Sequence, residues 1–196
     1  MKNLLTTCVL ITILTLCVST VFSQSKGQFM LGANAMVGIP TGDIGEISNT
    51  GFGFGAELKG FVSERISLGA ELSLISFPVK EEFIDEITGG MSGDLSESHQ
   101  FTSILADFNI FFASEGFRPY IGAATGLYMW KVKATAGGIT VTSDSFTKLG
   151  IGPEFGFLAP LSTKLDFKMT GRYNIVFDET GNATYFTVQG GLLYKL

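Results

Sequence analysis

Hydrophobic and polar residues alternate along much of this chain, and residues 165–177 show the pattern most clearly. Every second position there holds a bulky apolar residue or a glycine. The positions between them carry polar or charged side chains: Asp166, Lys168, Thr170, Arg172 and Asn174. Because successive side chains of a β-strand point to opposite faces, this pattern predicts a strand with one apolar and one polar face.

Further segments with the same period bring the number of predicted strands to eight. They are residues 28–39, 51–62, 66–77, 100–112, 118–131, 146–158, 164–177 and 184–196. After residue 23 no uninterrupted apolar run reaches the roughly 20 residues that a membrane helix needs. No helical period of 3.6 residues persists there either. Any segments that span a membrane must therefore be strands.

The connectors between these strands alternate in length. The short ones are residues 63–65, 113–117 and 159–163, and the long ones are residues 40–50, 79–99 and 132–145. The last connector, residues 178–183, is again brief and is typical of a hairpin turn. Short turns on one side and longer loops on the other characterise barrels of bacterial outer membranes. We therefore predict an all-β fold, an eight-stranded antiparallel up-and-down transmembrane β-barrel.

Alternation alone does not say which face points outward, because a soluble lipocalin-like barrel has the same period with its apolar face inside. Here the polar face consists mainly of small residues with scattered single charges, which suits a narrow lumen. We therefore expect a network of charges inside the lumen: Glu57, Lys59, Glu71, Asp107, Lys148, Glu154, Asp166, Lys168 and Arg172. The opposite arrangement would place Lys168 and Arg172 in hydrocarbon, at a cost of about 2 to 4 kcal/mol each.

Two features depart from simple alternation. Pro153 lies in the middle of a predicted strand and has no N–H to donate, so we predict a local bulge there. In residues 118–131, Tyr120 and Tyr128 share a phase with small residues, while Ile121 and Leu127 take the other phase. The sequence leaves both assignments of the inward face of that strand open.

Aromatic residues gather toward the predicted strand ends. They are Phe101, Phe111, Phe117, Tyr120, Tyr128, Trp130, Phe177, Tyr185 and Tyr194. Girdles of aromatic side chains at the two lipid interfaces explain most of them.

The first 23 residues read as a secretory signal peptide. Lys2 precedes a long uncharged run that ends at Ser23, where we expect cleavage. Residues 24–196 would then form one barrel domain. Both cysteines, Cys8 and Cys17, lie in the signal segment, so the mature chain would hold neither a disulfide nor a thiolate metal site.

The composition supports a surface that faces lipid. Charged residues make up 16% of the chain, against roughly 25% in soluble domains. Glycine accounts for 25 of 196 residues. The 13 basic residues are outnumbered by 18 acidic ones, which argues against nucleic-acid binding.

Two segments carry a family resemblance. Residues 31–58, LGANAMVGIPTGDIGEISNTGFGFGAEL, and the closing QGGLLYKL resemble the small outer-membrane β-barrel family in its Bacteroidota form, akin to the membrane domain of outer-membrane protein A. The resemblance implies the outer membrane of a Gram-negative bacterium, with its lipid and lipopolysaccharide as partners. It also implies a C-terminal signal for the barrel assembly machinery: Gln189, Gly191, Tyr194 and Leu196.

An eight-stranded barrel is filled by its own side chains, which argues against a general porin. We expect a non-enzymatic protein without a cofactor, with a structural or surface-interaction role through its extracellular loops and an unidentified surface or envelope partner. One alternative is a barrel-embedded enzyme that modifies lipid A, in which His99 and its neighbours Ser96, Glu97 and Ser98 would supply a Ser-His-acid arrangement. The other is a soluble lipocalin-like binder of a small apolar ligand.

The loop from Lys80 to Ser98 is strongly acidic. Its carboxylates are Glu81, Glu82, Asp85, Glu86, Asp94 and Glu97. They are candidates for holding a divalent cation shared with lipopolysaccharide phosphates. A solvated loop explains the same composition, and the spacing does not match an EF-hand.

Overall fold

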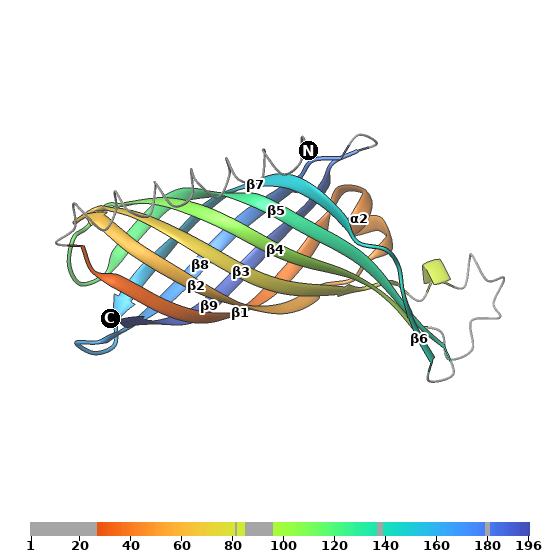
Figure 1. Cartoon of the computed structure of the whole chain (residues 1–196), viewed down its shortest axis with the longest axis horizontal. Coiled ribbons are helices and arrows are strands. Elements are labelled where there is room, and N and C mark those ends of the chain that lie inside the picture. Colours follow the sequence, from red (N-terminus) through yellow and green to blue (C-terminus); the bar gives the residue numbers. More distant parts are fainter. Residues whose placement is uncertain (1–26, 81, 85–95, 137–138, 179–180) are drawn as a thin grey trace, which may run out of the picture.

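A computed structural model describes residues 27–80, 82–84, 96–136, 139–178 and 181–196. Within these residues, eight long antiparallel strands close into a barrel (Figure 1). The strands are β1 (Phe29–Thr41), β2 (Gly51–Ser63), β3 (Ile66–Pro78), β4 (Ser96–Phe111), β5 (Arg118–Ala136), β7 (Phe146–Pro160), β8 (Leu165–Val176) and β9 (Ala183–Lys195). Pairing of β1 with β9 closes the barrel. The predicted eight-stranded antiparallel barrel is confirmed, and its insertion in a membrane stays a prediction. The predicted signal peptide and most of the acidic loop lie outside the described residues.

Two short elements escaped the sequence pattern. The helix α2 (Gly42–Ile47) follows β1, and the strand β6 (Ile139–Thr142) pairs with the end of β5. Gly42 begins the helix with a φ of 60°, a conformation that glycine adopts without strain. Both elements are too short to show a period of their own. No helix in the described part of the chain is long and apolar enough to cross a bilayer.

The two ends of the barrel differ (Figure 1). At the turn end, residues 64–65, 112–117 and 161–164 join consecutive strands, and the C-terminus lies beside them. At the loop end, α2 lies by the mouth, and parts of β4, β5 and β6 extend past the rim. We call this extension, residues 96–100, 131–136 and 139–142, the projecting sheet.

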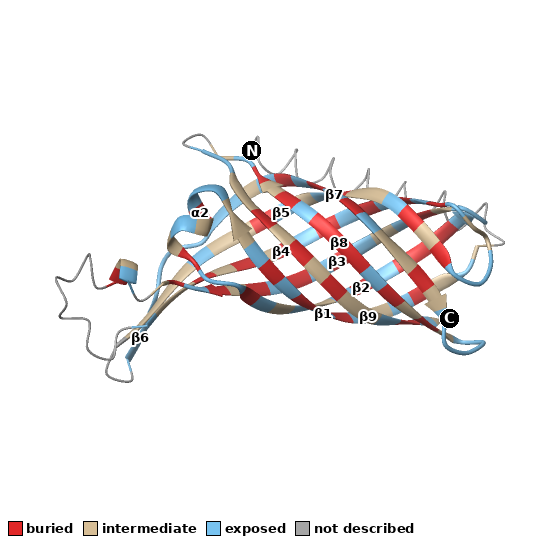
Figure 2. Cartoon of the chain, turned by 180° about the vertical axis from the view of Figure 1, so that it is seen from behind, coloured by how far each residue is buried: buried red, intermediate tan, exposed pale blue. Residues whose placement is uncertain are grey.

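Buried and exposed residues alternate along every barrel strand (Figure 2). On β2, Phe52 and Phe54 are 69% and 64% exposed, whereas Glu57 and Lys59 are buried. The apolar face therefore points outward and the polar face lines the lumen. This distribution is the reverse of that in a soluble barrel with an apolar interior.

The strand pairing also settles the two irregular features. β7 keeps one register with β5 and with β8 on both sides of Pro153, and only the ladder to β8 is interrupted at Gly152 and Pro153. The predicted bulge at Pro153 is wrong, because the missing N–H is accommodated by a local break in pairing without an inserted residue. In β5, Tyr120 and Tyr128 point into the lumen and Ile121 points outward.

Candidate functional site

Three layers of buried side chains fill the lumen. The layer at the turn end is apolar and consists of Met30, Phe61, Phe111, Tyr120, Leu158 and Leu193. The layer at the loop end is aromatic and aliphatic, and consists of Met36, Ile44, Ile75, Phe77, Phe101, Leu105, Ala124, Tyr128, Val176 and Tyr185. A central layer of buried ion pairs lies between these two layers.

Arg172 is the centre of the charged layer. Its Nη1 and Nη2 atoms donate to the two carboxylate oxygens of Glu71 at 2.8 and 2.9 Å, and its Nε donates to Glu154 at 2.7 Å. The fork of the guanidinium matches a carboxylate in this bidentate geometry. Since Arg172 is on β8 and Glu71 is on β3, the contact joins opposite walls of the barrel.

Two further ion pairs complete the layer. Lys168 Nζ lies 2.6 Å from Glu57 Oε2, and Lys59 Nζ lies 2.5 Å from Asp107 Oδ1. Asn109 donates a further hydrogen bond to Asp107 at 2.6 Å. Each pair again joins strands that are not neighbours in the sheet. The attraction within each buried pair offsets part of the cost of removing both charges from water.

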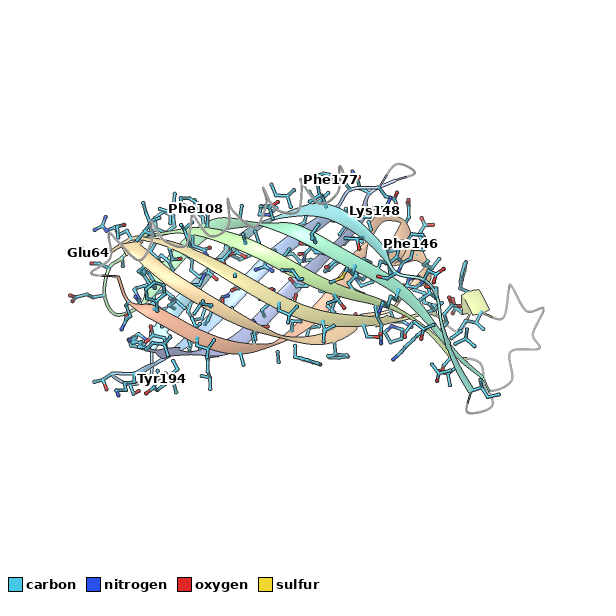
Figure 3. The ribbon with its side chains drawn as sticks, in the orientation of Figure 1. Glu64, Phe108, Phe146, Lys148, Phe177 and Tyr194 are labelled. Carbon is cyan, nitrogen blue, oxygen red and sulfur yellow. The ribbon has the colours of Figure 1, made fainter. Side chains whose placement is uncertain are left out.

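The other two predicted charges lie at the ends. Asp166 is at the turn end, where it binds Arg118 and, at 2.7 Å, Lys195. Lys148 is half-buried near the loop end and pairs with Asp178 at 2.9 Å (Figure 3). The structure thus brings seven of the nine predicted residues into the central layer, as the contacts of Arg172, Lys168 and Lys59 show.

Sequence reasoning missed several lumen residues. Arg118 and Lys195 are each within a residue or two of a strand end, where the expected phase is weakest, and Asn109 carries no charge to mark it. Asn34 is buried with both amide atoms unpaired among the described residues, although it shares the phase of other inward residues of β1. Their position in the alternating pattern was the signal in the sequence that could have placed these side chains in the lumen.

The predicted assembly signal divides between the two faces of β9. Gln189 is buried in the lumen, and Gly191 pairs with Asn34 and Lys168. Tyr194 is exposed at the turn end (Figure 3), and Leu196 is exposed beyond the strand. Recognition of this segment by an assembly machinery stays a prediction.

The aromatic residues correct the girdle prediction. Five of them are buried inside the lumen: Phe101, Phe111, Tyr120, Tyr128 and Tyr185. Phe117, Phe177 and Tyr194 are exposed. The girdle prediction is wrong for the buried five, because the phase of a residue, and not its distance from the strand end, decides its face. Tyr120 and Tyr128 also find polar partners inside, Thr170 at 2.5 Å and Asn174 at 3.0 Å.

His99 lies at the loop end of the lumen. Its Nδ1 is 3.2 Å from Ser48 Oγ, and its ring packs edge-on against Trp130 at 5.5 Å. Both His99 and Ser48 are buried, and within the described chain no carboxylate is hydrogen-bonded to the ring. A nucleophile must be reachable by substrate and a triad needs an acid on the histidine. The contact instead connects the segment after α2 to β4.

α2 is held against the barrel mouth by its neighbours. Ile44 inserts into the layer at the loop end, and Lys80 Nζ donates to the carbonyl oxygens of Gly45 and Glu46, both at 2.9 Å. A cation at the carboxyl end of a helix is favourable. Of the described residues, no three His, Cys, Asp or Glu side chains gather as a metal site. Cation binding by the loop from Lys80 to Ser98 therefore stays a prediction.

Comparison with known proteins establishes the fold. No protein-family model matches the chain. No curated protein matches it either. Among solved structures, Neisserial surface protein A has a TM-score of 0.60 at 19% identity, over 86% of this chain and 97% of that one. A major outer membrane protein from Thermus thermophilus has a TM-score of 0.54 at 14% identity, over 86% and 99%. Ail, the attachment invasion locus protein of Yersinia pestis, has a TM-score of 0.53 at 12% identity, over 87% and 97%.

These likenesses confirm that the chain has the barrel fold of small outer-membrane proteins. At such identities they show the fold alone. The resemblance to the Bacteroidota family stays a prediction.

Proposed function

We propose that this chain is a non-enzymatic protein of a Gram-negative outer membrane, exported by a signal peptide that is cleaved after Ser23, and that it acts at the cell surface through its loop end. One observation carries the proposal: the barrel has an apolar outer surface and keeps buried ion pairs in the middle of its lumen. Exposed outer side chains include Phe52, Phe54, Leu149 and Phe155, each at least 60% exposed. These side chains form an apolar belt around the outside of the barrel. A continuous apolar surface of this kind is suited to lipid and not to water.

The positions of outward-facing charges support the same placement. Glu64 and Arg65 are exposed in a turn at one end, and Lys131 is exposed on the projecting sheet at the other. Outward residues between them, such as Leu72 and Phe108, are apolar (Figure 3 for Phe108). Since short turns of such barrels face the periplasm, the loop end faces the exterior.

The filled lumen supports a role as a scaffold for the loops and argues against a role as a pore. Side chains of all three layers occupy the interior, and ion pairs cross it from wall to wall. The loops on a rigid scaffold are then the parts that differ between barrels and contact partners. Outer-membrane lipid and lipopolysaccharide would surround the belt, and the barrel assembly machinery would insert the protein.

The test uses the absence of cysteine from the mature chain. Asp144→Cys at the loop end and Glu64→Cys at the turn end are both exposed positions. On intact cells, a membrane-impermeant maleimide should label Asp144→Cys and not Glu64→Cys, and permeabilised cells should label both. Fractionation should recover the protein in the outer membrane, with a heat-dependent shift in electrophoretic mobility. Recovery as a soluble periplasmic protein, or labelling of Glu64→Cys alone, would overturn the proposal.

A further inference from the structure

The projecting sheet ends in an open strand edge. β6 is the last strand in the order of the sheet and pairs with β5 along residues 133–136. Among the described residues no strand pairs with its other side. Figure 1 shows β6 beyond α2, past the rim of the barrel.

The hydrogen bonds of the hairpin show which backbone groups face this open edge. Ser143 N donates to Val132 O at 2.9 Å, so the residue pair 132 and 143 is a hydrogen-bonded one. Such pairs recur at every second residue of an antiparallel ladder, which assigns Val141 to the next pair. The residues between, Thr140 and Thr142, therefore direct their N–H and C=O groups away from β5. Within the described ranges, these groups form a short row of backbone donors and acceptors that no other strand uses.

The two faces of the projecting sheet have different chemistry. On the face that continues the lumen side, Ile139 and Val141 are 72% and 66% exposed. The opposite face carries Thr140 and Thr142 on β6 and, on β5, Lys131 and Lys133. Within the described part of the sheet the one carboxylate, Glu97, lies on the same face as Val141 and not beside the lysines. One face is thus largely apolar and the other is basic.

We propose that the projecting sheet binds an extended segment of a partner protein, which adds to β6 as a further strand. Backbone groups repeated at every second residue, about 7 Å apart, match another extended chain and not a sugar or a lipid headgroup. Charge complementarity selects the segment: acidic side chains face Lys131 and Lys133, and apolar side chains cover Ile139 and Val141. The inference deepens the proposed function and rests on it, since the partner must reach the loop end from outside the cell.

The experiment uses the full mature protein in lipid nanodiscs and a labelled, end-blocked peptide of five Glu-Val repeats. Fluorescence anisotropy measures its dissociation constant, and a peptide of five Lys-Val repeats is the charge control. Replacing both threonines by proline (T140P with T142P) removes two N–H groups that face the open edge and leaves the bonds to β5 intact. We expect this variant to bind the acidic peptide about tenfold more weakly or worse.

Matched variants distinguish loss of the backbone N–H groups at the open edge from unfolding and from a change of charge. Serine at both positions (T140S with T142S) keeps the N–H groups and should bind like the unmodified protein. Replacing both lysines (K131E with K133E) should invert the preference between the two peptides. The mobility shift and the fluorescence of Trp130 report whether each variant is folded. Equal affinity of the folded proline variant, equal binding of both peptides, or no binding by the unmodified protein would each overturn the proposal.

Other occupants give different results. If dimers form in nanodiscs and the proline variant loses them, the edge serves a second copy and the partner-protein proposal is wrong. If lipopolysaccharide binds in a way that needs Lys131 and Lys133 but tolerates the prolines, a glycolipid is the ligand and the proposal is wrong. The maleimide test on Asp144→Cys does not depend on peptide binding. If Asp144→Cys is not labelled on intact cells, the proposed surface location is wrong. If it is labelled and the peptide does not bind, the strand-addition proposal alone is wrong.

Discussion

Arg172 shows how one buried residue holds distant parts of the chain. It is 2% exposed, and its contacts with Glu71 and Glu154 connect three strands. Truncating one member of such a group leaves the others charged and unpaired inside the lumen, which costs more than the intact group contributes. The half-exposed pair of Lys148 and Asp178 is the natural contrast, since exposed pairs contribute little.

We therefore expect Arg172→Leu to lower the free energy of unfolding in lipid vesicles by about 3 to 5 kcal/mol. Lys148→Leu should change it by less than about 1 kcal/mol. Trp130 is the only tryptophan, so its fluorescence during urea titration reports unfolding of both variants. Equal effects of the two substitutions would show that the central layer contributes no more than the rim.

At the same scale, the sequence predicted which charges face inward but not which of them touch. Alternation fixes the face of Glu71 and Arg172, and it carries no information on contacts across a closed barrel. The girdle prediction for the aromatic residues failed for a related reason. Tyr128 was placed in a lipid girdle by its distance from a strand end, whereas its phase beside Gly126 and Ala124 places it inside.

The strands themselves are the most predictable elements, because an apolar belt and a filled lumen impose one period along their whole length. Their ends are less predictable where the belt stops. β5 runs to Ala136 and not only to Lys131, and its alternation of polar and apolar residues in fact continues through Lys133 and Ala134 to that end. The predicted strand was therefore ended too early. α2 depends on tertiary contacts of Ile44 and on Lys80, which no local pattern encodes.

Close strand contacts depend on glycine at several positions, of which Gly122 is one. A Cβ at Gly122 would lie 2.2 Å from Asn109 Oδ1 and 2.3 Å from the Phe108 carbonyl oxygen. Gly122→Ala should therefore destabilise the barrel by about 1 to 3 kcal/mol, because β4 cannot move away without loss of pairing. Gly190 has no atom within 4 Å of the same position, so Gly190→Ala is the control and should be near neutral. The midpoint of the heat-dependent mobility shift measures both, and equal midpoints would contradict the expectation.

At the scale of the whole molecule, the reversal of inside and outside makes a prediction that depends on the surroundings. Leu72 is exposed in the middle of β3, where Ala56 and Ile104 are its outward partners across the strands. In water, replacing an exposed leucine by arginine costs little. In hydrocarbon the same change costs about 2 to 4 kcal/mol near the midplane.

Leu72→Arg should therefore lower the free energy of unfolding from lipid vesicles by that amount. Val141→Arg, at a similarly exposed position on the projecting sheet, should leave it nearly unchanged. Urea titration of both variants in vesicles checks the difference. A neutral Leu72→Arg would place this surface in water and contradict the lipid belt.

Closure by the first and last strands also has a consequence for the order of events during synthesis. β1 finds its second neighbour only when β9, the final strand, has been made. The pairs of Glu57 with Lys168 and of Glu71 with Arg172 likewise join early and late parts of the chain. None of these contacts can form before the later partner, on β8 or β9, has been synthesised. Until then β1 keeps an open edge, and the carboxylates of Glu57 and Glu71 lack their lysine and arginine partners.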